Sequence, residues 1–449
     1  MKRSTQYPIG LLLFLCANIA VAGGSLSAEV DQIVERYRSR GLLDGVSVAI
    51  TEGESVRHLR GYGSCGGQPV AADTGLLLGS ASKPLTAFRA LQMLQTGRLA
   101  LDAPVASYLP DSRGQPVGTM TIRQLLTHTS GYTRKQGHAI PDLVGGALYA
   151  LAPGKPGAFA YSNFNYVVLG LVLEAVEGSP FAEQMQRHIF EPLAMSATSA
   201  DAAASASLCS KRMWFGLPFE TTEQVARKAL VPAGFIRSTA QDMARWLIAV
   251  EAGPDAHPAV PTDIDALMGE SRYGFGWSYG SYAGEPIAWH NGSTATYASS
   301  VVRLPKRDVG IVVLANTPPG LLQNPVDALA RDLIERVVTG DAQPAAGWPW
   351  ERALLFTVLG ALLLSAFRTL RLALQPRSRR APTKRWQRAV VTLAAVGLLT
   401  AFTIGWPLPA GSLWALRPDL LLALLAGCAL SLMRQWLRPL LRARTARAE

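Results

Sequence analysis

Hydrophobic and polar positions follow three different patterns along the 449-residue chain. Residues 1–22 contain one short apolar run, and residues 30–340 contain short stretches of strand-like and helix-like periodicity. Residues 351–449 contain three long apolar segments separated by arginine-rich stretches. Short amphipathic patterns are typical of a folded globular unit, whereas long apolar segments flanked by arginine are typical of membrane spans. The pattern therefore predicts a leader, a globular domain at 29–340 and a C-terminal membrane region.

The central region carries both strand and helix periodicity. Residues 46–63 alternate around a Glu-Gly-Glu turn, and residues 297–316 are typical of two strands joined by a charged turn. Residues 85–99 and 165–178 carry apolar side chains at helical spacing and contain a glycine at or near the end. With no internal repeat evident, this mixture predicts a single α+β domain.

The first 22 residues are typical of a signal peptide. Lys2 and Arg3 precede an apolar run of 14 residues, from Ile9 to Ala22, that ends in Ala-Val-Ala. A basic start, a short apolar run and small residues at the cleavage site are the marks of an exported protein. Cys16 follows a bulky leucine, which does not fit a lipoprotein processing site, so we expect export without lipidation.

Positive charge is concentrated at the C-terminal end. Residues 351–449 hold 15 Lys and Arg against 3 Asp and Glu, whereas the first 350 residues hold 28 against 29. A uniformly basic chain would suggest nucleic acid as a partner, but basic residues that flank apolar runs suggest a membrane anchor. We therefore expect a membrane-embedded protein that does not bind nucleic acid.

The membrane region is predicted at 351–437, after a Pro-rich linker at 341–350. Its three predicted spans lie at about 353–369, 389–407 and 412–433. Because the arginines gather in the loop after the first span and in the tail 438–449, these parts are predicted to be cytoplasmic. The globular domain would then face the periplasm from the bacterial inner membrane. The alternative is that the three segments are buried helices of a soluble domain.

Cysteine usage leaves the redox chemistry open. Cys16 leaves with the leader and Cys428 lies in an apolar tail segment, so Cys65 and Cys209 are the cysteines of the exported part. They could form a disulfide in an oxidising compartment, or remain two separate thiols.

Ser80 and Lys83 form the first candidate constellation. On a helix, residues three apart share a face, so Lys83 could take the proton of Ser80 if burial or a nearby positive charge lowers the pKa of the lysine. Gly79 would let the chain enter the helix tightly, and Pro84 is tolerated only if the helix begins near Ala81. Taken alone, this pattern more often marks an ordinary, solvated first turn.

Two later motifs add to the first. Tyr161 and Asn163 precede a predicted helix, where a phenol could relay a proton and a carboxamide could hold a substrate amide. His290 and Gly292 lie on a predicted edge strand, where the glycine would let a substrate approach and the backbone amide of Ser293 could donate to an oxyanion. Alone, the Tyr-x-Asn motif would be interpreted as a helix cap, and the His-x-Gly motif as a turn at the end of a strand.

Together, Ser-x-x-Lys, Tyr-x-Asn and His-x-Gly resemble the serine β-lactamase and penicillin-binding protein superfamily, and most closely its class C β-lactamase-like branch. The segments at 125–132, 191–198, 232–247 and 273–277 are similar to framework segments of that branch. The resemblance covers about residues 30–340. It implies a β-lactamase/transpeptidase-like fold, with an antiparallel sheet flanked by helices and a helical lobe.

The resemblance also implies the roles of the residues. Ser80 would be the acylated nucleophile, Lys83 its general base and Tyr161 the proton relay, and the amides of Ser80 and Ser293 would form the oxyanion hole. The substrate-binding residues would be Asn163, His290, Gly292 and Ser293. The third motif departs from the Lys-Thr-Gly of dedicated class C enzymes. A neutral His290 weakens the expectation of efficient β-lactamase activity and fits substrates with no anionic group at that position.

The favoured function is therefore a membrane-anchored serine hydrolase, with a peptidase or amidase acting on a small or peptide-like substrate preferred. The layout is similar to that of membrane-tethered peptidases that mature nonribosomal-peptide prodrugs, as in colibactin-type pathways, by removing an N-acyl-D-asparagine cap. The alternative is an esterase, DD-peptidase or weak β-lactamase acting on cell-envelope substrates. A β-lactam sensor or an inactive fold is the non-enzyme alternative. The remaining histidines show no metal-ligand spacing, so neither metal nor cofactor is expected, and a transporter or membrane partner is left open.

Overall fold

The structure is a computed structural model that describes residues 26–340, apart from 141–145, 204–208, 215–216, 223–227, 252–265, 269–270, 295 and 318–323. The predicted leader, linker, membrane spans and basic tail lie outside the described residues and stay predictions. Among the residues that are described, no helix is both long and apolar enough to cross a membrane.

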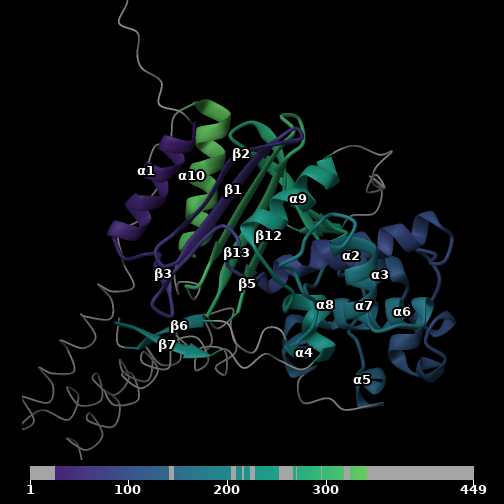
Figure 1. Cartoon of the computed structure of the whole chain (residues 1–449). Helices are drawn as coiled ribbons and strands as arrows, with labels where there is room; N and C mark the ends of the chain where they lie inside the picture. The colour runs from purple at the N-terminus through teal and green to yellow at the C-terminus, as the bar shows by residue number, and fades with distance from the viewer. Residues whose placement is uncertain are drawn as a thin grey trace, which may run out of the picture.

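An eight-stranded antiparallel sheet forms the centre of the domain, in the order β2-β1-β14-β13-β12-β11-β10-β9 (Figure 1). Its strands are β1 (Val46–Glu52), β2 (Ser55–Tyr62), β9 (Ala266–Met268), β10 (Ser271–Gly274), β11 (Trp277–Tyr282), β12 (Glu285–Ser293), β13 (Ala298–Leu304) and β14 (Val309–Ala315). Three two-stranded ribbons are formed by β3 (Ser64–Cys65) with β4 (Gln68–Pro69), β5 (Leu76–Leu77) with β8 (Arg237–Ser238), and β6 (Cys209–Trp214) with β7 (Leu217–Thr222).

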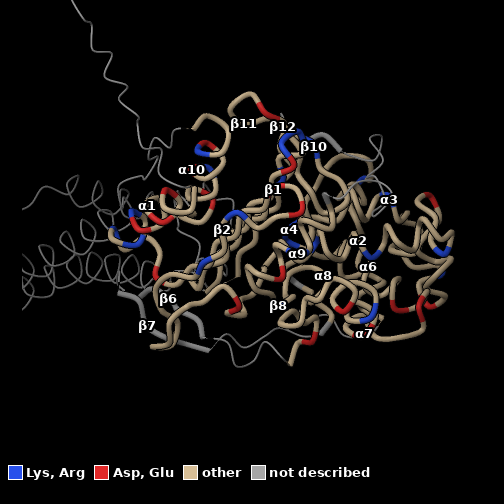
Figure 2. Tube along the Cα trace, turned by 45° about the horizontal axis from the view of Figure 1, so that its top comes forward, with Lys and Arg blue, Asp and Glu red and all other residues tan. Residues whose placement is uncertain are grey.

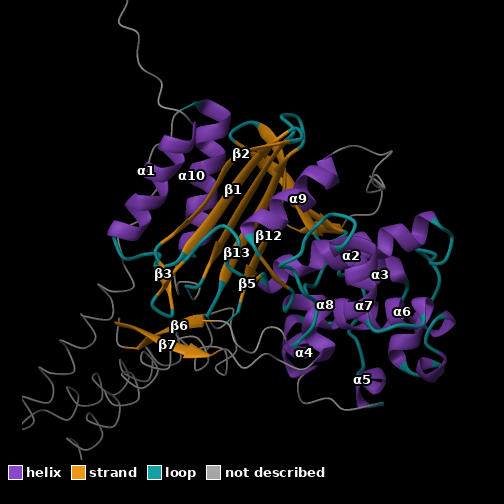
Figure 3. Ribbon diagram, in the orientation of Figure 1, coloured by secondary structure: helices purple, strands orange, loops and turns teal. Residues whose placement is uncertain are grey.

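Helices cover both faces of the sheet, and further helices form a lobe beside it (Figure 3). The described helices are α1 (Leu26–Ser39), α2 (Ser82–Gln95), α3 (Ile122–Leu126), α4 (Arg134–Ala139), α5 (Ala147–Ala150), α6 (Asn163–Glu177), α7 (Phe181–Met185), α8 (Val231–Gly234), α9 (Ala240–Glu251) and α10 (Pro325–Thr339). Helices α1 and α10 pack together on one face, and α9 packs on β1 and β14 from the other. The predicted α+β fold of a sheet, flanking helices and a helical lobe is confirmed.

The sheet divides the hydrophobic core into two clusters. Val48 and Ile50 of β1 face the cluster under α1 and α10, whereas Ala49 between them faces the cluster shared with the helical lobe. Side chains of a strand point alternately to opposite faces, and a sheet covered on both sides buries both sets. All of β14 is accordingly buried. The strand pattern at 297–316 predicted two such strands, and this prediction is confirmed.

The helix boundaries also follow the sequence signals. Helix α2 begins at Ser82, so Pro84 lies within its first turn, where a missing backbone N–H costs no helical hydrogen bond. Helix α6 ends at Gly178, which adopts the left-handed conformation with φ of 76° and caps the helix. Both helices were predicted. Helix α2 carries Lys83 of the first motif, and α6 carries Asn163 of the second.

Charged residues of both signs are interspersed along the described chain (Figure 2). This distribution fits the near balance of charge in the first 350 residues.

The structure shows in part whether Cys65 and Cys209 are thiols or form a disulfide. Cys65 forms a disulfide, and the strand that carries it, β3, contacts β6, which begins at Cys209. The alternative in which Cys65 stays a separate thiol is therefore wrong.

Candidate active site

Ser80 lies in a 3₁₀ turn, Gly79–Ala81, that leads directly into α2. Gly79 has a φ of +53°, and a Cβ at this position would lie 2.5 Å from the backbone nitrogen of Ser293. Only glycine combines that conformation with such a close approach. The hydroxyl of Ser82 fixes the turn, because it donates to the carbonyl oxygen of Gly79 (2.8 Å) and accepts the N–H of Ile236 (3.1 Å). Ser80 is thus held half-buried beside the end of β12.

Lys83 is fully buried one helical turn after Ser80. Its Nζ donates to Oδ1 of Asn163 (2.8 Å) and to the carbonyl oxygen of Ala233. Burial, reinforced by the charge of Arg134, holds the pKa of Lys83 well below its usual value of 10.5. A neutral amine has two N–H groups and one lone pair, so these two bonds use both donors and leave the lone pair for a proton. This is the state that a general base needs.

Tyr161 lies beside Lys83 and Ser80. The lysine Nζ is 4.8 Å from the centroid of the Tyr161 ring and 5.6 Å from that of Tyr166. The Tyr161 hydroxyl is buried and forms no hydrogen bond of ordinary geometry with the described residues, yet it lies close enough to Ser80 to interact. Burial raises the pKa of Tyr161 to about 12, and Ser80 partly opposes this shift. Tyr161 therefore keeps its proton under conditions in which Lys83 has lost its own.

The second motif is positioned by the start of α6. Ser162 is the N-cap, and its hydroxyl accepts the N–H of Phe164 (3.3 Å). Asn163, the first residue of the helix, then reaches Lys83. The structure thus brings Ser80, Lys83, Tyr161 and Asn163 together, as the sequence predicted.

The prediction of an edge strand for the third motif is wrong, because β12 lies inside the sheet between β11 and β13. The register supplies the reason for the edge-like pattern. Pairing with β11 runs only as far as Trp289, whereas pairing with β13 continues to Ser293. His290 to Ser293 are therefore unpaired on the β11 side, and the turn of Ser80 lies against Gly292 and Ser293.

Gly292 makes this contact possible. A Cβ at Gly292 would lie 1.8 Å from the carbonyl oxygen of Leu78 and 3.0 Å from the nitrogen of Ala81. The hydroxyl of Ser299 on β13 also donates to the oxygen of Leu78 (2.6 Å). The backbone of β12 and the turn of Ser80 therefore touch directly, and this places the amide of Ser293 beside the nucleophile turn.

His290 is buried and uncharged. Its Nδ1–H donates to the carbonyl oxygen of Asn291 (2.7 Å), and the Tyr273 hydroxyl lies 3.2 Å from its Nε2. Burial and the charge of Lys83 lower the pKa of His290 to about 3. Since both ring nitrogens already have partners, the third motif offers the cleft an uncharged ring and no cation. Its assignment as a substrate-binding residue stays a prediction.

His128 lies in the framework-like segment 125–132, and the structure shows which groups it contacts. Its carbonyl accepts the N–H of Ala160 (2.8 Å), and its Nδ1 accepts the N–H of Ser162 (3.4 Å). Its ring lies 4.5 Å from the Tyr161 ring, centroid to centroid. His128 thus accepts hydrogen bonds from the residues on both sides of Tyr161 and contacts the Tyr161 ring. The tautomer follows from Asn165, whose Oδ1 accepts from Ser130 and whose Nδ2 faces Nδ1 (2.9 Å).

Replacing His128 with leucine is expected to lower kcat by about 10- to 100-fold, because Tyr161 loses its support and small displacements of catalytic groups are costly. The effect should vanish in a Tyr161→Phe background, which a double-mutant cycle measures. His128→Asn is the matched control. Asparagine tolerates the φ of 56° at this position and keeps an acceptor, so its loss should be smaller. An equal loss with and without Tyr161 would mean that His128 acts on the fold alone.

The pH dependence of acylation follows from Lys83 and Tyr161. The rate requires a neutral Lys83, so kcat/KM for a neutral ester should rise with pH and level off well below pH 10.5. Arg134→Gln removes a neighbouring positive charge, which lets Lys83 hold its proton more tightly. The midpoint of the rise should therefore move to higher pH. A shift to lower pH, or none, would contradict the assignment of Lys83 as the base.

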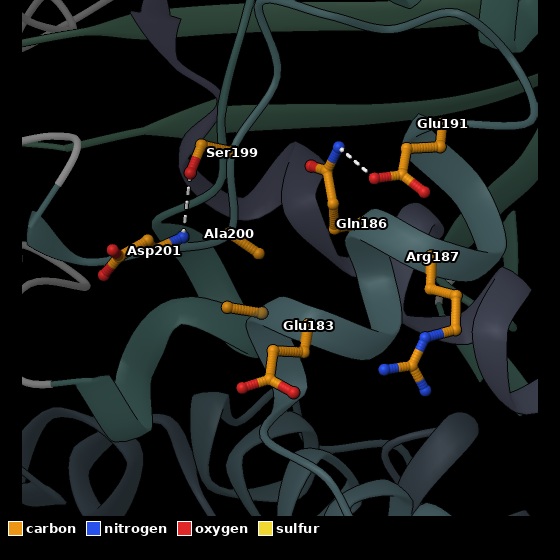
Figure 4. Close-up of a pocket in the computed structure, with 8 residues that line it drawn as sticks. Glu183, Gln186, Arg187, Glu191, Ser199, Ala200 and Asp201 are labelled. Atoms are coloured by element: carbon orange, nitrogen blue, oxygen red, sulfur yellow. Dashed lines mark hydrogen bonds between the residues drawn. The ribbon is translucent and has the colours of Figure 1, made fainter.

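A hollow of about 380 Å³ lies in the helical lobe, away from Ser80 (Figure 4). It is lined by Ala182, Glu183, Gln186, Arg187, Glu191, Ser199, Ala200 and Asp201. The hydroxyl of Ser199 accepts the N–H of Asp201 (3.1 Å), and no lysine, histidine or tyrosine is among the described residues that line this hollow, so it lacks the Ser-Lys-Tyr arrangement found around Ser80. The nucleophile and base of this domain are therefore sought at Ser80.

Two curated proteins are distant relatives of this chain. Protein flp of Staphylococcus aureus (strain MW2) is 26% identical over 319 residues, which cover 64% of this chain and 62% of the relative. Unguisins hydrolase ungD' of Aspergillus campestris is 24% identical over 336 residues, which cover 66% and 62%. The chain thus spans 62% of the length of these relatives.

Solved structures share the fold. The octameric penicillin-binding protein homologue from Pyrococcus abyssi is 22% identical, with a TM-score of 0.59 over 70% of this chain and 77% of that one. D-alanine carboxypeptidase AmpC from Burkholderia cenocepacia is 25% identical, with a TM-score of 0.58 over 69% and 98%. The family model for Beta-lactamase matches residues 30–336. With this match, the fold and the three motifs gathered around Lys83, the chain belongs to the β-lactamase family.

Proposed function

We propose that the protein is a serine hydrolase that works through an acyl-Ser80 intermediate, and most specifically a peptidase or amidase. The observation that carries the proposal is the state of Lys83. It is fully buried one turn from Ser80, both of its remaining donors are used, and its pKa is held well below the usual value. A lysine in this state is placed to remove a proton rather than to carry one.

The geometry supports the following sequence of steps. Lys83 takes the proton of Ser80 as Oγ attacks the substrate carbonyl carbon, and the amides of Ser80 and Ser293 stabilise the oxygen that becomes negative. Tyr161, which holds its proton until this step, donates it to the leaving group as the bond breaks, and the proton that Lys83 took from Ser80 is returned to Tyr161. Water then cleaves the acyl-Ser80 ester and releases the acid, with Ser80 regaining its proton.

Peptide-like substrates are favoured by the polar groups of the cleft. Asn163 is half-buried beside Lys83 and has an amide N–H₂ available for a substrate carbonyl. The third motif lacks a cation, which disfavours a β-lactam whose carboxylate needs one. Esterase or DD-peptidase activity is the second candidate, and one fold neighbour is a D-alanine carboxypeptidase. The non-enzyme alternatives, a β-lactam sensor or an inactive fold, are disfavoured because Ser80, Lys83 and Tyr161 are gathered at one place.

We also propose that the domain lies outside the cytoplasm and is anchored in the inner membrane by the three C-terminal segments. The disulfide at Cys65 supports an oxidising compartment. The leader-like start and the arginine distribution support the orientation. A reporter fused to the C-terminus should be active only in the cytoplasm, and periplasmic activity would contradict three spans.

Intact-mass detection of the Ser80 adduct tests the hydrolase proposal. One sample of the full chain is treated with a fluorophosphonate. Separate, untreated samples are given panels of D-amino-acid peptides, esters and a chromogenic cephalosporin. Ser80→Ala is the matched control throughout. We expect a fluorophosphonate adduct on the wild-type chain alone and, at most, slow turnover of the cephalosporin. Folded wild-type protein that forms no adduct would refute the proposal.

A further inference from the structure

The exposed positive charge beside the reacting groups comes from Arg134 of α4 and not from the third motif. On the β12 side, His290 is neutral, and Asn291 points away, with its Oδ1 accepting from Ser300 of β13 (3.0 Å). Asn291 also approaches Asp327 of α10, and burial raises the pKa of that carboxyl to about 7. The third motif therefore presents no fixed cation to a substrate anion on the face of β12 that His290 occupies.

Arg134 supplies a cation beside Tyr161. It is exposed at the start of α4, and its guanidinium carbon lies 5.5 Å from the centroid of the Tyr161 ring. Its charge acts on Lys83, Tyr161 and His128, so it faces the reacting groups. Among the residues that the structure describes, it forms no ion pair that would neutralise it.

The short helix that carries Arg134, α4, packs directly against the second motif. A capping box formed by Thr133 and Gln136 fixes the first turn of α4. A Cβ at Gly137, in the same short helix, would lie 2.7 Å from the backbone nitrogen of Asn163. Helix α4 therefore sits directly on the residue that contacts Lys83, and the base of the Arg134 side chain is fixed relative to the reacting groups.

We propose that Arg134 is a specificity-determining residue that binds a carboxylate of the substrate on the Tyr161 wall of the cleft. The inference rests on the proposed hydrolase activity and names the class of substrate: acyl compounds that carry a carboxylate close to the scissile bond. A guanidinium binds a carboxylate through paired N–H donors, and an exposed cation that is not ion-paired with any described residue attracts anions. The substrate anion is thus received at α4 rather than at the third motif.

Arg134 also lowers the pKa of Lys83, so the test must separate binding from that effect. A change in Lys83 alters the rates of all substrates alike, whereas a lost carboxylate contact alters only those with the carboxylate. The informative quantity is the ratio of kcat/KM between an anionic ester and its neutral counterpart, measured with one enzyme at one pH.

Two matched pairs of esters place the carboxylate on either side of the scissile bond. The first pair is mono-p-nitrophenyl adipate and its methyl ester, and the second is 4-carboxyphenyl butyrate and 4-carbamoylphenyl butyrate. We expect the wild-type chain to prefer the anionic member of at least one pair. Arg134→Gln should lower that preference by about fivefold or more, Arg134→Lys should keep part of it and Arg134→Glu should reverse it.

The control is Lys135→Gln, which removes an exposed positive charge one residue away. It should leave the ratio unchanged. Equal losses for the anionic and neutral members in Arg134→Gln, or an equal effect of Lys135→Gln, would overturn the inference. Fluorophosphonate labelling of the wild-type chain is checked first. Failure to label refutes the hydrolase proposal, whereas labelling with no preference in either pair refutes only the role of Arg134.

Discussion

Replacing Lys83 with methionine is expected to slow acylation of Ser80 by about 10³-fold or more, because the serine loses its base and the other groups cannot substitute for it. Tyr161 cannot take over the role, since burial keeps its pKa at about 12. Methionine has a similar volume and is apolar, so the buried site should remain filled. Fluorophosphonate labelling rates measure the loss, and labelling within tenfold of wild type would rule out Lys83 as the base.

The same substitution should change how stability depends on pH. The pKa of Lys83 is lowered in the folded chain, so the unfolded chain binds a proton at a pH where the folded chain does not. Stability from this group therefore rises as pH increases toward the unfolded value of 10.5 and falls as pH decreases. Urea unfolding of the full chain at pH 7 and pH 9 should show a gain for wild type that Lys83→Met lacks. An identical pH dependence in both proteins would contradict the lowered pKa.

The substitution Gly292→Ala is expected to abolish most activity and to destabilise the domain by about 3 kcal/mol, a cost typical of forced overpacking. The new methyl group would lie 1.8 Å from the carbonyl oxygen of Leu78, which is backbone and cannot rotate away. Either the turn of Ser80 or the end of β12 must move. Both carry an amide of the predicted oxyanion hole.

Thermal unfolding and ester turnover measure the two effects of Gly292→Ala. Gly146→Ala is the control, because a Cβ there would meet nothing within 4 Å and its φ is an ordinary −63°. That variant should keep wild-type stability and activity. If Gly292→Ala were as active as Gly146→Ala, the close contact between β12 and the turn of Ser80 would not matter for the reaction.

Local patterns predicted what depends on neighbours in the chain. The strand pairs at 46–63 and 297–316 and the end of the helix at 165–178 follow from alternation, turn residues and a glycine stop, although the helix begins at Asn163, two residues earlier than predicted. The gathering of Ser80, Lys83, Tyr161 and Asn163 was predicted because three motifs in order resemble one family. Long-range packing, by contrast, has no local signature.

The misplaced edge strand shows this limit. His290 to Ser293 carry the pattern of an edge because they lack a partner on one side, but the strand as a whole is interior. Arg134 was missed for a similar reason. Its approach to Tyr161 depends on how α4 sits on α6, and a single exposed arginine in a short polar stretch gives no signal in the sequence.

The pairing of β1 with β14 bears on how the domain folds after synthesis. Val46 pairs with Ala315, so a central pair of strands joins the two ends of the domain. Such distant contacts slow folding, because a long chain must be closed before the pairing stabilises it. Until β14 has emerged, β1 lacks its neighbour in the sheet and leaves an apolar strand open to aggregation. We therefore expect truncation before β14 to yield an insoluble chain rather than a smaller folded domain, with solubility and protease resistance as the measurements.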